Sequence, residues 1–316
     1  MSQILFIKTS SLGDVIHHMP AVTEARRRLP AARFAWAVEE EFAPLVALHP
    51  AIESVIPVAS RRWRRAYLAP STWSQVRAFA RGLQARTYDA VIDTQGLFRS
   101  ALIARLARGQ RHGYDAASIK ERLAAPLYDV HHRVDRSLHA IARNRLLTGL
   151  SLGYTPADAI DFGLDRATLS GASGSRRAVL LHATARPEKQ WPLDCWIALG
   201  TKLAAQGYDL VIPWGNEAER LRSEAIAARV PRAQVPQRRP LDEVARLIAG
   251  ASLVVGVDTG LVHLAAALGV PVVAVFVDTA PGLYGPMGSG PIAILGGNGA
   301  PPTVAEVAAA AETIAS

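Results

Sequence analysis

Short apolar runs alternate with segments of helical periodicity along the whole of this 316-residue chain. In the first half, we expect strands at 3–8, 34–38, 54–58 and 88–93, and helices at 15–29, 73–86, 97–108 and 136–150. In the second half, we expect strands at 178–183, 209–214, 252–257 and 271–277, and helices at 192–206, 217–229, 241–250, 260–268 and 303–315. This alternation predicts parallel βαβ units with helices on both faces of a sheet, which is an α/β fold.

A segment rich in glycine, serine, aspartate and proline interrupts the alternation. It runs from Tyr154 to Arg177 and has no clear periodicity, which is typical of a linker. The chain length also suits two domains. We therefore predict Rossmann-like α/β domains at 1–165 and 175–316, facing across a cleft, with packing of the terminal helix back on the first domain as an alternative. Ligands of open parallel sheets bind at the carboxyl ends of the strands, so functional residues should follow strands.

The basic excess is confined to the first half of the chain. Residues 1–170 carry 23 lysines and arginines against 15 acidic residues, which accounts for the whole net charge of +8. This asymmetry predicts an anionic partner, such as nucleic acid, anionic lipid or a phosphorylated substrate, although a solvated basic surface would also explain it. A single cysteine, Cys195, excludes an intramolecular disulfide and fits a reducing compartment. The sequence has no targeting segment and no apolar run long enough to cross a membrane, so we expect a soluble or surface-bound protein.

The motif KTSSLGD at 8–14 follows the first strand and opens the first helix. Gly13 permits a tight turn, and amides at the helix start can hold an anion. The motif is neither a Walker A loop nor GxGxxG, which argues against a dinucleotide. Asp14 would lie at the mouth of the cleft, where its carboxylate is a candidate general base; the alternative is that it only caps the helix.

Three loops of the second half also follow strands. In HATARPEKQWP at 182–192, Thr184 offers a hydroxyl and Lys189 a point charge suited to phosphate, unless this is a plain surface loop. In PWGNEAE at 213–219, Glu219 is a candidate ribose ligand or merely a first-turn glutamate favoured by the helix dipole. In GVDTGLVH at 256–263, a helix N-terminus predicts a pyrophosphate site. Its candidate residues are Asp258, Thr259, Gly260 and His263.

The basic cluster RRWRR at 61–65 is the last candidate site. Its four guanidinium groups can bind phosphates or carboxylates, and Trp63 could lie on a sugar or a lipid surface; a solvated charge run is the alternative. The chain lacks an Asp-x-Asp pair, a His/Cys cluster with zinc spacing and a GxSxG elbow, so the sequence predicts neither a metal site nor a serine hydrolase.

Together these motifs resemble the ADP-heptose:lipopolysaccharide heptosyltransferases of glycosyltransferase family nine, and within it those of type I. The resemblance rests on KTSSLGDVIHHMPA, VIPVASRRWRR, YDAVIDTQGL, HATARPEKQWP, PWG and VDTGLVHLAAALGVP, which span nearly the whole chain in order. It implies a GT-B fold and an inverting, metal-independent transfer of heptose from ADP-heptose to the Kdo of Kdo-lipid A, with no cofactor. It also implies a cytoplasmic monomer, peripheral on the inner face of the inner membrane.

The resemblance assigns roles to individual residues. Asp14 would be the base, and Lys189, which we also count as catalytic, would hold the diphosphate together with the helix N-terminus. The donor-binding set is Thr184, Lys189, Glu219, Asp258, Thr259, Gly260 and His263. The acceptor-binding set is Arg61, Arg62, Arg64, Arg65, Lys120 and Arg143. Ala185 and the Val277–Thr279 segment depart from the family pattern, which often has a second threonine and Gly-Pro-Thr at these places.

Other interpretations remain open at this point. The nearest is a type II or III heptosyltransferase, which uses the same donor and a heptosylated acceptor. A second is a nucleotide-sugar-binding protein without catalysis, for which Asp14 would not be needed. A third is a nucleic-acid-binding protein, suggested by the isoelectric point of about 10.0 but without any recognised nucleic-acid-binding motif.

Overall fold

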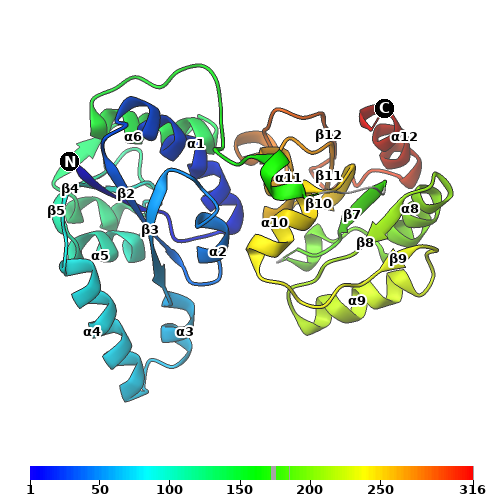
Figure 1. The fold of residues 1–316 in the computed structure, drawn as a ribbon, viewed down its shortest axis with the longest axis horizontal. Coiled ribbons are helices and arrows are strands. Elements are labelled where there is room, and N and C mark those ends of the chain that lie inside the picture. Colours follow the sequence, from blue (N-terminus) through cyan, green and yellow to red (C-terminus); the bar gives the residue numbers. More distant parts are fainter. Residues whose placement is uncertain (172–175, 185, 316) are drawn as a thin grey trace. The chain divides into compact units, whose positions relative to one another are not determined.

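The computed structural model describes residues 1–171, 176–184 and 186–315. They form two compact units, Met1–Gly163 and Leu164–Ser316. Each unit contains one six-stranded parallel sheet with helices around it (Figure 1). The predicted α/β class with two parallel sheets is therefore confirmed.

The first unit is built on the strand order β3-β2-β1-β4-β5-β6. Its strands are β1 (Gln3–Ile7), β2 (Arg33–Glu39), β3 (Ile52–Val58), β4 (Thr87–Asp93), β5 (Arg108–Tyr114) and β6 (Val130–His132). Its helices are α1 (Leu12–Arg28), α2 (Ala43–Val46), α3 (Ser60–Arg65), α4 (Pro70–Gln84), α5 (Phe98–Leu106) and α6 (Ala140–Leu152), with a 3-10 helix at Arg122–Leu127. The order reverses between β1 and β4, which makes their carboxyl ends the switch point where ligands of such folds bind.

The second unit repeats this topology in the order β12-β11-β10-β7-β8-β9. Its strands are β7 (Arg177–Leu181), β8 (Asp209–Val211), β9 (Ala233–Gln234), β10 (Leu253–Val257), β11 (Val272–Phe276) and β12 (Ile292–Gly296). Its helices are α7 (Arg166–Ser170), α8 (Leu193–Ala205), α9 (Glu217–Ala227), α10 (Leu241–Ala249), α11 (Gly260–Ala267) and α12 (Val304–Ile314), with 3-10 helices at Pro187–Lys189 and Gly282–Tyr284. Here the switch point lies between β7 and β10.

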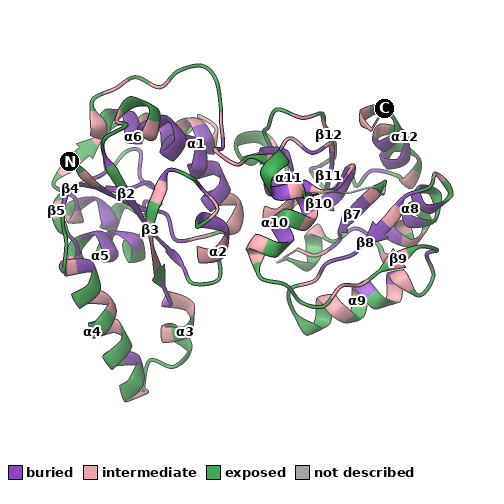
Figure 2. Ribbon diagram, viewed as in Figure 1, coloured by how far each residue is buried: buried purple, intermediate pink, exposed green. Residues whose placement is uncertain are grey.

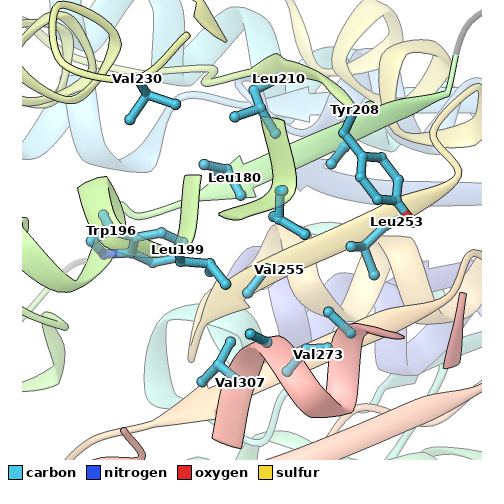
Figure 3. Close-up of a cluster of buried hydrophobic side chains, with 14 of the residues drawn as sticks. Leu180, Trp196, Leu199, Tyr208, Leu210, Val230, Leu253, Val255, Val273 and Val307 are labelled. Atoms are coloured by element: carbon cyan, nitrogen blue, oxygen red, sulfur yellow. The ribbon is translucent and has the colours of Figure 1, made fainter. Parts of the chain in front are cut away.

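The central strands of both sheets are continuous apolar runs because helices cover both of their faces. Figure 2 shows these strands as buried, and Figure 3 shows one core of the second unit. In that core, Trp196 and Leu199 of α8 pack with Leu180 of β7, Val255 of β10 and Val307 of α12. The terminal helix α12 therefore helps to cover the sheet of its own unit.

Candidate active site

In the first unit, the loop after β1 is fixed by the loop after β4. The side-chain oxygen Oε1 of Gln95 accepts hydrogen bonds from the amides of Thr9 (3.1 Å) and Ser10 (3.3 Å). Oδ1 of Asp93 in turn accepts from the amides of Gln95 (2.8 Å) and Gly96 (3.2 Å). Two loops at the switch point are thus joined by side chains that follow neighbouring strands.

Asp14 lies in the first turn of α1 and is half-buried. Its Oδ2 accepts hydrogen bonds from the amide of Ser11 (2.9 Å) and from the Ser11 hydroxyl (3.1 Å). Asp14 therefore caps the helix, as the simpler interpretation of the sequence expects. Its Oδ1 receives no hydrogen bond from the described residues, so one carboxylate oxygen keeps its acceptor capacity.

Lys8, which sequence reasoning did not single out, is a buried cation beneath this loop. Its side chain is 5% exposed, and its Nζ donates to the carbonyl of Thr94 (3.0 Å) and to Oδ1 of Asn144 (3.4 Å). Burial lowers the pKa of Lys8, while the nearby carboxylates of Asp14 and Asp93 favour its charged form. The side chain of Lys8 therefore lies within electrostatic reach of Asp14 from inside the fold.

Two of the predicted acceptor residues lie near the same loop. The positive charges of Lys120 and Arg143 both lower the pKa of Lys8, so they act on it over a short range. Arg143 is fixed by a hydrogen bond from Nη2 to the carbonyl of Ser118 (2.7 Å) and by its guanidinium group, 4.8 Å from the centre of the Tyr114 ring. Asp14, Lys120 and Arg143 therefore all lie within electrostatic reach of Lys8.

The other four predicted acceptor residues lie on the short helix α3, at the carboxyl end of β3. Arg61 forms an ion pair with Glu41, and Arg62 forms one with Glu40 at 2.9 Å, which lowers the pKa of Glu40. Arg64 and Arg65 are exposed. Two of the four guanidinium groups thus already have acidic partners, and two are open to solvent.

In the second unit, the predicted donor residues Thr184, Lys189 and Asp258 come together at the switch point. Nζ of Lys189 contacts Oδ2 of Asp258 at 2.5 Å, and the Thr184 hydroxyl donates to the carbonyl of Asp258 at 3.2 Å. The hydroxyl of Thr279, just after β11, also donates to Oδ2 of Asp258 (2.8 Å). One carboxylate thus joins loops that follow β7, β10 and β11, and Thr279 was not among the predicted ligands.

The N-terminus of α11 adjoins this network. Thr259 is the residue before the helix, and the amides of Gly260 and Leu261 have no acceptor among the described residues. Amides in this position, with the dipole of the helix behind them, suit a phosphate oxygen. His263, one turn further, is buried.

Glu219 caps α9, and its hydrogen bonds go to residues outside this network. Its carboxylate accepts from the amide of Gly215 (2.7 Å) and from the side-chain amide of Asn216 (2.7 Å), and its own amide donates to Oδ1 of Asn216 (3.0 Å). These contacts agree with the alternative interpretation, in which Glu219 is a first-turn glutamate of the helix. The departure from the family pattern at Ala185 lies outside the described residues.

No group of three or more histidine, cysteine, aspartate or glutamate side chains within 1–171, 176–184 and 186–315 has the arrangement of a metal site. In the same ranges, no helix is long and apolar enough to span a bilayer.

Two sheets in Rossmann order, each with polar loops at its switch point, define an α/β protein of the nucleotide-binding type. The model of glycosyltransferase family 9 (heptosyltransferase) matches residues 76–312. Lipopolysaccharide heptosyltransferase 1 of Escherichia coli K12 is 43% identical over 290 residues, which cover 90% of this chain and 91% of that protein. The chain belongs to glycosyltransferase family 9.

Solved structures agree with this assignment. The E. coli heptosyltransferase WaaC with ADP superposes with a TM-score of 0.92 at 40% identity, over 98% of this chain and 99% of that one. WaaC with ADP-2-deoxy-2-fluoro heptose gives a TM-score of 0.87 at 39% identity, over 98% of both chains. The predicted GT-B fold class and the assignment as a glycosyltransferase are confirmed.

Proposed function

We propose that this enzyme transfers L-glycero-D-manno-heptose from ADP-heptose to the Kdo sugar of Kdo-lipid A, with inversion and without a metal ion. The donor is supported by the likeness to heptosyltransferase structures that hold ADP and an ADP-heptose analogue. The observation that carries the proposal is the site formed by Thr184, Lys189 and Asp258 beside the N-terminus of α11. It offers an ammonium group and free amides at one switch point, which suits a diphosphate.

In this proposal, Asp14 takes the proton from the acceptor hydroxyl as that oxygen attacks the anomeric carbon. The bond from the anomeric carbon to the β-phosphate oxygen breaks at the same time, and ADP leaves with the electron pair. Lys8 lies beneath the same loop, and the Asp14 carboxylate favours the charged form of its buried amino group. Lys189 and the α11 amides stabilise the negative charge that grows on the diphosphate.

The first unit would hold the acceptor. Lys120 and Arg143 act electrostatically on Lys8, as Asp14 does, and the arginines of α3 follow a strand of the same sheet. Kdo carboxylates and lipid A phosphates are anionic, in agreement with a net charge that lies wholly in residues 1–170. We place the enzyme as a monomer at the cytoplasmic face of the inner membrane, where such an acceptor is accessible.

The test is release of ADP from ADP-heptose in the presence of Kdo-lipid A, with the mass of the lipid product as a second readout. We expect Asp14→Asn to lower kcat by about 10²–10⁴-fold without loss of thermal stability, because asparagine keeps an acceptor for Ser11 but is not a base. Asp165→Asn is the matched control, since Asp165 also caps a helix by accepting from the amide of Ala167 at 3.0 Å.

Each alternative outcome has a definite meaning. Equal activity of Asp14→Asn and the wild type would reject Asp14 as the base. Turnover only with an acceptor that already carries heptose would assign the enzyme to type II or III. Binding of ADP-heptose without ADP release from any acceptor would leave a nucleotide-sugar-binding protein.

A further inference from the structure

Helices α3 and α4 form a hairpin that extends away from the sheet of the first unit (Figure 1). The hairpin follows the carboxyl end of β3, so it starts from the same sheet edge as the Asp14 loop. Figure 2 shows it mostly exposed or half-buried, and only Thr72 and Leu83 of its helical residues are buried. A projecting element of this kind adds little to the core, which suggests that it serves another purpose.

Hydrogen bonds within the hairpin hold its tip in one shape. The indole Nε1 of Trp73 donates to the carbonyl of Tyr67 (3.0 Å), and the Thr72 hydroxyl donates to the carbonyl of Ala66 (2.7 Å). Further from the tip, the Trp63 ring packs edge-on against Phe79, with ring centres 5.5 Å apart. Trp63 therefore joins the two helices and does not belong to the exposed tip.

The tip presents three large apolar side chains to solvent. Tyr67 is 61% exposed, Leu68 80% and Trp73 54%. Clustered apolar side chains on a projecting tip have no packing role in the folded chain and mark an interaction surface. Tyrosine and tryptophan are also the residues best suited to the boundary between water and lipid, because their rings are amphipathic.

The charge around this tip has a single sign. Residues 60–86 contain seven arginines and no acidic residue. Five of the arginines, Arg64, Arg65, Arg77, Arg81 and Arg86, are exposed and form no ion pair with any described residue. Arginines around exposed aromatic and aliphatic side chains suit a lipid surface, which has anionic headgroups above an apolar interior.

We infer that the tip of the α3–α4 hairpin docks on an anionic lipid bilayer, with Tyr67, Leu68 and Trp73 at the headgroup level and the arginines on lipid phosphates. The choice of a bilayer as the partner rests on the proposed function, in which the acceptor is a membrane lipid. The contact requires no acceptor molecule, because the apolar tip and the unpaired arginines recognise the lipid surface itself. It would hold the carboxyl edge of the first sheet, with Asp14, at the membrane surface.

The experiment is co-sedimentation of the full chain with vesicles of phosphatidylethanolamine and phosphatidylglycerol that contain no acceptor lipid. We expect wild-type binding that weakens with salt and is lost on vesicles of neutral phosphatidylcholine. Leu68→Ser should lower the partition coefficient about tenfold, and Arg77→Gln/Arg81→Gln about 25-fold at low salt. The matched controls are Leu221→Ser, since Leu221 is 56% exposed on α9, and Arg229→Gln/Arg238→Gln in the second unit; both should bind as the wild type does.

Several results would overturn this inference. They are failure of the wild type to bind anionic vesicles, equal binding by the hairpin variants and the controls, or binding only when acceptor lipid is included. Self-association that Leu68→Ser abolishes, without vesicle binding, would identify a second copy of the chain as the partner instead. ADP release with a de-acylated, water-soluble acceptor separates the two proposals, because the hairpin variants should still release ADP in this assay. If neither the wild type nor the variants release ADP while vesicle binding is intact, only the proposed function is rejected.

Discussion

Lys189 and Asp258 form an ion pair of 2.5 Å between two loops that are 69 residues apart in the sequence. Both side chains are less than one-fifth exposed, so solvent screens the pair only partly. In this pair, the carboxylate holds the ammonium group beside the N-terminus of α11, where the diphosphate would bind. A bound diphosphate must therefore either displace the Asp258 carboxylate from Lys189 or share the ammonium group with it.

Replacement of this lysine tests its role directly. We expect Lys189→Met to lower kcat/KM for ADP-heptose by about 10²–10³-fold, because it removes a side-chain cation that would balance charge on the leaving group. Lys202→Met is the control, since Lys202 is an exposed lysine on α8 of the same unit. Steady-state kinetics with a varied donor measure the effect; a Lys189→Met enzyme with wild-type kinetics would exclude Lys189 from the reaction.

Thr279 contacts the same carboxylate of Asp258 as Lys189 does. Its hydroxyl shares Oδ2 of Asp258 with the ammonium group. We expect Thr279→Val to strengthen the hold of Asp258 on Lys189 and to raise KM for the donor up to about tenfold, with a smaller change in kcat. Thr279→Ser keeps the hydroxyl and should restore the wild-type KM. Equal KM values for the valine and serine variants would contradict this role.

Most of the strands could be predicted because central strands of a parallel sheet are continuous apolar runs. The predicted run at 252–257 became β10, and that at 88–93 became β4. β5, with the sequence RGQRHGY, was missed because only its last three residues are buried, and the predicted helix at 97–108 extended into it. α3 was described only as a basic cluster because the ring contact between Trp63 and Phe79 depends on the next helix.

The sequence located the site loops but not their partners. Asp14, Lys189 and Asp258 all follow strands, and that position made them candidates. The order of the strands in the sheet decides which loops meet, and the periodicity of the sequence does not reveal that order. For example, β7 pairs with β10, although two strands separate them in the sequence. For the same reason Lys8 could not be recognised as a buried cation, since its hydrogen bond to Asn144 spans 136 residues.

The buried ion pair of Arg145 with Glu24 should be the most sensitive charged contact of the first unit. The two side chains are 8% and 9% exposed and meet at 3.0 Å, and Arg145 also donates to the carbonyl of Ala159 (3.0 Å). Arg145→Met would leave the carboxylate of Glu24 buried without its cation, at a cost of about 3–5 kcal/mol in the free energy of unfolding.

An exposed pair provides the comparison for Arg145. Arg27 and Asp161 also form an ion pair, but their side chains are 60% and 43% exposed. Solvent screening should limit the effect of Arg27→Met to about 1 kcal/mol or less. Thermal and urea unfolding measure both variants, and equal losses would mean that burial does not set the strength of these pairs.

Stability at mildly acidic pH should depend on His49, which is 1% exposed. Nδ1 of His49 accepts a hydrogen bond from the amide of Ala51 (3.2 Å), so Nε2 carries the proton toward the Thr23 hydroxyl, 3.0 Å away. The site fits a neutral ring, and burial lowers the pKa of His49 from 6.5 to about 4. The unfolded chain therefore binds a proton at His49 between pH 6.5 and 4, whereas the folded chain does not.

The sign of the pH effect follows from this difference in bound protons. Above pH 6.5 the ring is neutral in both states and His49 adds no pH dependence. As the pH falls from 6.5 to 4, the free energy of unfolding should drop by up to about 1.4 kcal/mol per pH unit from this residue. His49→Gln should be less stable at neutral pH but should lose less stability across that range, whereas His131→Gln, at an exposed position, should keep the wild-type slope. Urea unfolding at several pH values between 4 and 7 measures these slopes, and a His49→Gln slope as steep as that of the wild type would show that His49 titrates normally in the folded protein.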